Sequence, residues 1–297
     1  ESVDVNTIYD VPNHMYRECL DKVALKKLKL DYNEPDLNSW NNFLEKYKNP
    51  KDTIKIALIG KYVELQDSYK SILESFIHAG AVNEVDVEVI PLHSEFINSE
   101  NVNDKLQSFN GILVAPGFGE RGVEGKIEAI KYVRLNNIPF FGICYGMQMA
   151  VIEYARNMLK LDDANSTEVN PHTKNPVIDL MEEQKNITEK GGTMRLGAWK
   201  CHITKETLCH SVYKTENIEE RHRHRYELNN KYLNQLEENG LVASGKNKDT
   251  NLVEVVEVKD HPWFIGVQYH PEYKSTVLSP HPLFVSFVGA AILNKNK

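Results

Sequence analysis

Ile138-Pro139-Phe140-Phe141-Gly142-Ile143-Cys144-Tyr145-Gly146 is the stretch of the sequence that decides the fold. An apolar run ends in a cysteine flanked by glycines, and a long helical pattern follows, as is typical of a strand that turns sharply into a helix. Such a turn needs small neighbours, because a Cβ on either flank would clash with the reversed backbone. The pattern predicts that Cys144 stands at the carboxyl end of a buried strand.

The chain before and after this stretch alternates between strand and helix patterns. The expected strands are 54–59, 85–90, 111–115 and 139–143, and the expected helices are 68–81, 124–135 and 144–159. This alternation predicts an α/β fold in which a central, mostly parallel sheet carries helices on both faces. Ligands of such sheets gather beyond the carboxyl ends of the strands, where Cys144 is expected.

The two ends of the chain differ in pattern from its middle. Additional β-strands are expected in the second half, at 252–258 and 264–269, and residues 281–293 predict a closing helix. Residues 1–50 are polar and charged, with a short helical pattern over 15–28. We therefore expect one domain over 51–297, preceded by a tail or linker over 1–50.

Bulk composition limits the class of protein. The chain has 297 residues, 41% of them hydrophobic, which is enough for a sizeable core. Its formal net charge of −7 argues against a nucleic-acid partner. The four cysteines show no pairing rhythm, and their spacing fits no standard zinc site, so no metal is expected. Without a membrane-length apolar run or a signal-peptide profile, we expect a cytoplasmic protein with no membrane partner.

A cysteine, a histidine and a glutamate are the candidate catalytic residues. Far downstream of Cys144, the sequence reads His270-Pro271-Glu272. A thiol attacks as the thiolate, which an adjacent histidine can generate, and a carboxylate can fix the tautomer of that histidine. The alternative is a buried cysteine that only packs. The flanking glycines and the His-x-Glu pair favour the catalytic interpretation.

Two further motifs could complete such a site. The run Gly117-Phe118-Gly119-Glu120-Arg121-Gly122-Val123-Glu124-Gly125 can expose backbone amides for an oxyanion hole, although an ordinary flexible turn has the same composition. It lacks the Lys-Ser/Thr ending of a phosphate-binding loop. In Glu219-Glu220-Arg221-His222-Arg223-His224-Arg225, a strand would point the arginines one way and the histidines the other. An arginine there could bind a carboxylate, or the run could be a solvated edge.

Several motifs together make the chain resemble the class I (triad) glutamine amidotransferases, and among them the glutaminase domain of the CTP synthase family. The class resemblance lies in 142–148 and 270–272. The narrower resemblance lies in Gly60-Lys61-Tyr62, Phe118-Gly119-x-Arg121-Gly122-x-Glu124-Gly125, Ala164-Asn165-Ser166-Thr167-Glu168, Gly191-Gly192-Thr193-Met194-Arg195-Leu196-Gly197 and Glu220-Arg221-His222-Arg223-His224-Arg225-Tyr226-Glu227. The likeness covers about residues 54–290 and implies a flavodoxin-like α/β domain.

The resemblance implies a reaction and its partners. Such a domain hydrolyses L-glutamine to glutamate and ammonia through a glutamyl thioester. The ammonia passes to a synthetase domain that uses ATP and Mg to aminate UTP to CTP, with GTP as activator. That domain is not in this sequence, and residues 1–50 would be its tail and the interdomain linker. The full-length enzyme would be a homotetramer, and the glutaminase domain would need no cofactor of its own.

The resemblance also implies roles for individual residues, carried over motif by motif. Cys144 would be the nucleophile, His270 the proton shuttle and Glu272 its orienting group; the amides of Gly117 and Tyr145 would form the oxyanion hole; and Phe118, Gln148, Glu168 and Arg225 would bind glutamine. Arg225 would take the α-carboxylate and Glu168 the α-ammonium group.

The sequence departs from the family pattern in two motifs. Ala115-Pro116 stands where the family usually has Pro-Gly, and proline restricts the loop that it enters. Tyr145 stands where the family usually has leucine, so a phenol could narrow the pocket or form a hydrogen bond in it. Two alternatives therefore stay open: a stand-alone triad hydrolase of another class, and a catalytically weakened regulatory or assembly domain.

Overall fold

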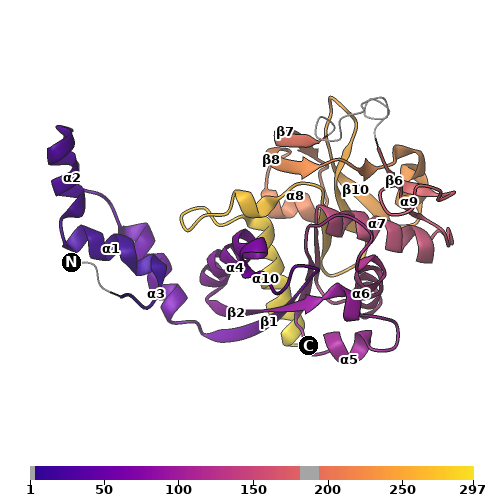
Figure 1. Cartoon of the computed structure of the whole chain (residues 1–297), viewed down its shortest axis with the longest axis horizontal. Helices are drawn as coiled ribbons and strands as arrows, with labels where there is room; N and C mark the ends of the chain where they lie inside the picture. Colours follow the sequence, from indigo (N-terminus) through magenta and orange to yellow (C-terminus); the bar gives the residue numbers. More distant parts are fainter. Residues whose placement is uncertain (1–3, 181–193) are drawn as a thin grey trace.

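A nine-stranded sheet runs through the centre of the molecule (Figure 1). The structure is a computed structural model that describes residues 4–180 and 194–297. In chain order, the strands of this sheet are β1 (Asp52–Gly60), β2 (Val85–His93), β3 (Gly111–Val114), β4 (Phe140–Ile143), β7 (Arg195–Ile203), β8 (Asn217–His224), β10 (Leu241–Lys246), β11 (Val253–Val258) and β12 (Phe264–Val267). Their order in space is β2-β1-β3-β4-β12-β11-β10-β7-β8.

The sheet has a parallel half and an antiparallel half. From β2 to β12 every neighbouring pair is parallel, and from β12 to β8 every pair is antiparallel. The prediction of an α/β fold with additional strands from the second half is confirmed. The sheet as a whole is mixed, because those later strands extend one side of the parallel core.

Helices cover both faces of the sheet. One face carries α4 (Lys70–Asn83), α8 (Leu208–Tyr213) and α10 (Pro282–Lys295); the other carries α5 (Val102–Leu106), α6 (Val123–Asn136), α7 (Tyr145–Asn157) and α9 (Leu233–Glu238). Phe140 and Phe141 divide between the two apolar clusters because successive side chains of a strand point to opposite faces. No described helix is long and apolar enough to span a bilayer.

A smaller sheet lies beside α7. It contains β5 (Asn165–Ser166), β6 (Pro176–Asp179) and β9 (Glu227–Leu228), in the order β5-β6-β9. Single turns of 3₁₀-helix connect other elements: η1 (Ile8–Asp10), η2 (Gln66–Tyr69), η3 (Ser94–Phe96), η6 (Asn230–Tyr232) and η7 (Pro271–Tyr273). The small sheet fixes Glu168, just after β5, and Arg225, just before β9, near the end of the main sheet.

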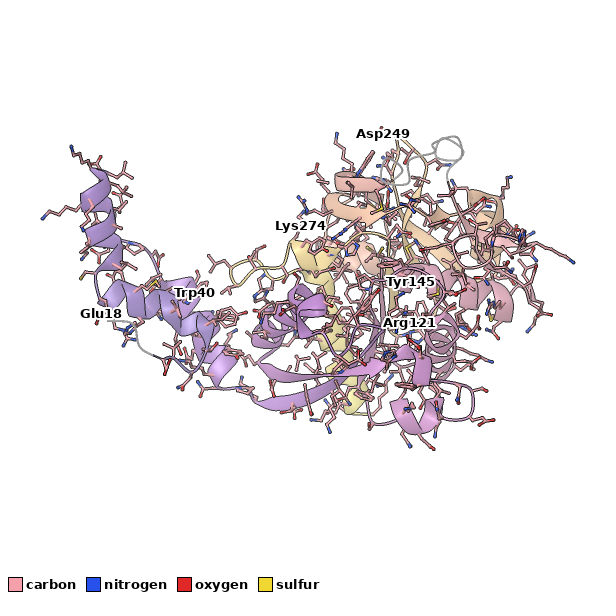
Figure 2. The ribbon with its side chains drawn as sticks, in the orientation of Figure 1. Glu18, Trp40, Arg121, Tyr145, Asp249 and Lys274 are labelled. Atoms are coloured by element: carbon pink, nitrogen blue, oxygen red, sulfur yellow. The ribbon has the colours of Figure 1, made fainter. Side chains whose placement is uncertain are left out.

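Helices between residues 8 and 48 lie to one side of the main sheet (Figure 1). These helices are α1 (Val11–Arg17), α2 (Leu20–Leu28) and α3 (Asn38–Lys48). Trp40, labelled in Figure 2, lies on α3, and Phe43 one turn later joins Tyr9 and Ala81 of α4 in a small apolar cluster. This contact attaches the segment to the main body. A domain boundary near residue 50 stays a prediction.

Candidate active site

Cys144 occupies a strained turn between β4 and α7. Its backbone has φ 52° and ψ −99°, in a region that residues other than glycine rarely adopt. A Cβ on Gly142 would come within 2.8 Å of the backbone carbon of Gly146, and a Cβ on Gly146 would overlap the carbonyl oxygen of Val114. The Cys144 amide donates to the carbonyl of Val267 over 2.7 Å, which fixes the turn to β12. The sequence can fold this way because glycine stands two residues before and two residues after Cys144.

His270 and Glu272 follow β12 and form a buried pair. Nδ1 of His270 donates to Oε1 of Glu272 over 2.7 Å, and the ring of Tyr273 stacks on the imidazole with centroids 5.1 Å apart. Burial alone lowers the pKa of His270, but its interactions with Cys144 and Glu272 outweigh burial and raise the pKa to about 11. The raised pKa favours the protonated imidazole, whose Nε2 has no hydrogen-bond partner among the described residues.

One cavity of about 640 Å³ lies beyond the carboxyl ends of the parallel strands. It is lined by all nine residues that the sequence singled out: Gly117, Phe118, Cys144, Tyr145, Gln148, Glu168, Arg225, His270 and Glu272. This is the edge at which ligands of α/β sheets usually bind. The geometry therefore brings together every predicted site residue, although the individual roles stay predictions.

The glycine-rich loop over the cavity is tied down at three points. Nζ of Lys61 donates to the carbonyl of Phe118, and the hydroxyl of Tyr145 donates to the carbonyl of Gly119 over 2.6 Å. The amide of Gly119, whose φ is +70°, donates to Oε1 of Glu168 over 2.9 Å. The phenol of Tyr145 therefore forms a hydrogen bond with the loop, which is one of the two effects expected of a tyrosine at this position.

A carboxylate and a guanidinium face the same cavity. Burial raises the pKa of Glu168, and the Gly119 amide and the charges of Arg225 and Lys61 offset part of that rise. Arg225 stands one residue beyond β8, and its side chain interacts with the neighbouring Tyr226. The pair offers opposite charges to a ligand that carries both a carboxylate and an ammonium group.

Strand β8 alternates as predicted. Its arginines are exposed, whereas His222 and His224 are buried on the other side. Nε2 of His224 lies 2.7 Å from Oε1 of Glu227, and His222 lies 3.6 Å from the buried Glu254. Burial, with the charges around it, lowers the pKa of His222 to about 2. Both histidines are buried, but only His224 lines the cavity, whereas His222 packs behind it.

The motif at 191–197 lies partly outside the described residues. Gly191, Gly192 and Thr193 are not described, whereas Met194 lines the cavity. Arg195 is buried, with its guanidinium 2.6 Å from Glu254 and 3.4 Å from Glu227. Within the described ranges, no cluster of three or more histidine, cysteine or acidic side chains could hold a metal ion.

Sequence reasoning gave no role to two residues that shape the site. Tyr273 stacks on His270, and Lys61 fastens the glycine-rich loop. The sequence could have indicated Lys61, because this residue directly follows the carboxyl end of β1, and the site lies at that edge of the sheet. For Tyr273 the only signal was its position next to Glu272.

Comparisons with known proteins agree with this geometry. The profile of the family "Glutamine amidotransferase class-I" matches residues 64–290. A CTP synthase of Flavobacterium psychrophilum is 65% identical over 298 residues, covering 100% of this chain and 56% of that protein. A CTP synthase of Flavobacterium johnsoniae is 66% identical over 293 residues, covering 98% of this chain and 55% of that protein. The chain thus spans about half the length of these relatives.

A solved structure is similar over most of its length. It is the glutaminase domain of Trypanosoma brucei CTPS with bound acivicin, 37% identical, with a TM-score of 0.76. The match covers 81% of this chain and 94% of that one.

Proposed function

This chain belongs to the class I glutamine amidotransferases, of the kind found in CTP synthases, and on that premise we propose that Cys144 hydrolyses the side-chain amide of L-glutamine in the cavity. One observation carries the proposal. The Cys144, His270 and Glu272 side chains line the same cavity as Arg225 and Glu168, so a nucleophile and the two charges that an amino acid requires share one space.

Substrate binding follows from the charges in the cavity. The Arg225 guanidinium binds the α-carboxylate of glutamine, and Glu168 binds the α-ammonium group. Phe118 and Gln148 line the space between, and Oε1 of Gln148 has no protein partner among the described residues, which leaves it to accept from the substrate. The side-chain amide of glutamine then reaches Cys144.

The chemistry uses the protonated histidine next to the sulfur. The Cys144 thiolate attacks the amide carbon, and the resulting oxyanion is held by the amides of Gly117 and Tyr145. His270 donates its proton to the departing nitrogen, so that ammonia leaves and a glutamyl thioester remains. Water then attacks the thioester while His270 accepts its proton, releasing glutamate and the thiolate. Glu272 holds the imidazole by Nδ1 throughout.

We extend the proposal to the longer protein to which such a chain would belong. There the ammonia is consumed by a synthetase domain that aminates UTP to CTP with ATP and Mg, and GTP activates glutamine hydrolysis. The relatives' printed name, CTP synthase, and the length that they have beyond this chain support this assignment. A homotetramer and a cytoplasmic location complete the proposal; the four unpaired cysteines fit a reducing compartment.

Covalent labelling tests the nucleophile. The chain is incubated with acivicin, the compound bound in the trypanosome domain, and its intact mass and labelled peptide are measured. We expect one adduct, on Cys144, and no adduct in Cys144→Ala, which should also release no ammonia from glutamine while keeping its circular dichroism spectrum. Adducts on Cys144→Ala, or ammonia released by it, would rule out this nucleophile.

Substrate range separates the two enzyme classes. Ammonia release from free glutamine, without cleavage of γ-glutamyl peptides, supports the amidotransferase proposal. Cleavage of the peptides at a similar rate would instead support a stand-alone hydrolase.

A further inference from the structure

Gln268 lies next to the Cys144 sulfur and does not line the cavity. Its side chain is fully buried, and its Nε2 lies 3.7 Å from Sγ, within donor distance for sulfur. Gln268 is the residue directly after β12, and its own backbone amide donates to the carbonyl of Glu254 over 2.8 Å. The residue does not line the cavity, so it reaches the nucleophile without facing a substrate.

A backbone carbonyl fixes which end of this amide faces the sulfur. Nε2 of Gln148 lies 2.8 Å from the carbonyl oxygen of Tyr226, which can only accept, so the NH₂ group of Gln148 must point there. The same NH₂ group lies 3.2 Å from Oε1 of Gln268 and donates to it. The oxygen of Gln268 is therefore taken, and its NH₂ group is left to point at Cys144. A relay from Tyr226 through Gln148 orients Gln268.

The sulfur has competing neighbours that favour different protonation states. The carbonyl oxygen of Arg223, 4.0 Å from Sγ, can accept only from a thiol. An N–H donor stabilises the thiolate instead, because a hydrogen bond to the charged form favours that form. His270, the titratable group beside the same sulfur, supplies a cation to the thiolate, and Gln268 supplies a neutral donor from a second direction.

We propose that Gln268 is a further catalytic residue, whose side-chain amide holds the sulfur of Cys144 as a correctly aimed thiolate, with Gln148 setting its orientation. The inference deepens the proposed function and rests on Cys144 being the nucleophile. It assigns Gln148 a second task besides facing the substrate. It also predicts that Gln268 acts on turnover and not on the binding of glutamine.

The test measures the reactivity of the sulfur directly. The full chain is treated briefly with iodoacetamide across a series of pH values, and the labelling of Cys144 is divided by that of Cys19, an exposed cysteine that serves as internal reference. We expect Gln268→Leu to lower this ratio about tenfold at neutral pH, the size of one hydrogen bond to a charged group. Gln268→Glu should lower it further, because it places a like charge beside the thiolate.

Two features separate this effect from a general structural one. At alkaline pH, where the thiol ionises without help, the ratio should return to that of the unchanged chain. For glutamine hydrolysis, kcat should fall while KM stays within about twofold. Gln107→Glu, the same change at an exposed position, should alter neither quantity.

A second variant covers the case in which changes at the buried Gln268 prevent folding. Gln148→Glu cannot donate to either carbonyl oxygen and would accept from the Gln268 amide, turning its NH₂ group away from the sulfur. It should lower the labelling ratio at neutral pH although the side-chain hydrogen bonds of Gln148 go to Tyr226 and Gln268 and not to the Cys144 sulfur. An unchanged ratio in folded Gln268→Leu or Gln148→Glu would overturn the inference. If the unchanged chain neither labels Cys144 ahead of Cys19 nor releases ammonia, the proposed function itself fails.

Discussion

Arg225 offers a test, at the scale of single residues, of how glutamine is held. If its guanidinium binds the α-carboxylate, Arg225→Ala should raise the KM for glutamine about tenfold to a hundredfold and change kcat less, because a carboxylate clamp contributes to ground-state binding. Arg221→Ala is the matched control, since Arg221 is exposed on β8, which ends just before Arg225, and does not line the cavity. Steady-state ammonia release gives both constants. A fall in kcat at constant KM would contradict the clamp.

Lys126, on α6, is a buried cation that has no counter-ion in hydrogen-bond range within the described part of the chain. Its side chain is fully buried, its Nζ has no hydrogen-bond partner among the described residues, and it lies 5.3 Å from the centroid of the Tyr145 ring. Burial, aided by the charges of Lys61 and Arg121, lowers its pKa from 10.5 to about 8. The native state therefore binds this proton more weakly than the unfolded state does.

This difference makes the stability depend on pH in a definite direction. Below pH 8 both states are charged and the native state is destabilised by about 3 kcal/mol, at 1.4 kcal/mol per unit. As the pH rises from 8 to 10.5, the native state loses its proton first and the penalty disappears. Lys126→Met should thus raise the free energy of unfolding by up to about 3 kcal/mol at neutral pH and by little above pH 10.5.

Urea unfolding at several pH values measures this change. Lys131→Met, at a half-buried position on the same helix, should show no such trend. A Lys126→Met variant that is less stable than the unchanged chain at neutral pH would contradict the prediction.

The strand-turn-helix unit around Cys144 is tested at the scale of elements. A methyl group on Gly146 would overlap the carbonyl oxygen of Val114, and neither backbone can move without shifting β3 or α7. Gly146→Ala should lower the free energy of unfolding by about 3 kcal/mol or more and abolish ammonia release. Both are measurable by urea unfolding and by assay.

Gly289→Ala is the control for that variant. Gly289 lies within α10, where an added Cβ would meet its nearest neighbour at an ordinary 3.5 Å, so alanine should stabilise by about 0.5 to 1 kcal/mol. If the two substitutions changed the free energy of unfolding equally, the close approach of the backbone at Gly146 would not be the cause of the effect there.

The strand-turn-helix unit around Cys144 also shows which features can be predicted from the sequence and which cannot. Buried parallel strands are short continuous apolar runs between helical periods. The parallel strands and the helices α4, α6 and α7 were predictable to within about three residues, whereas the short helix α5 was not predicted. The strand β7 was not, because polar residues occupy many of its positions and its pairing with β8 and β10 is long-range. The position of Cys144 in a tight turn could be predicted from Gly142 and Gly146. The donor Gln268 was not, because its orientation depends on Gln148, 120 residues earlier in the chain.

At the scale of the whole molecule, we expect the isolated chain to be a slow glutaminase. Glu168 already accepts from the Gly119 amide, and the loop that carries Gly117 is tied by Lys61 and Tyr145. Substrate must therefore compete with these bonds unless something repositions the loop. In the proposed full-length enzyme, GTP and the synthetase domain do so.

Three assays of ammonia release from glutamine check this expectation. The first uses this chain alone, the second adds GTP, and the third uses a protein as long as the relatives. The rate should rise in the third assay and respond there to GTP. Rapid hydrolysis by the chain alone, unchanged by either addition, would contradict gating and indicate an autonomous glutaminase.

The position of β12 bears on how the molecule is synthesised. It is the last described strand to leave the ribosome, yet it lies between β4 and β11 and connects the two halves of the sheet. Until it emerges, β4 presents an open strand edge to the cell, a hazard that chaperones usually manage. His270, the proposed proton shuttle, follows β12 by three residues, so until then the nascent polypeptide cannot hold the proposed site. Translation itself thus delays ammonia release until nearly all of this chain has been made.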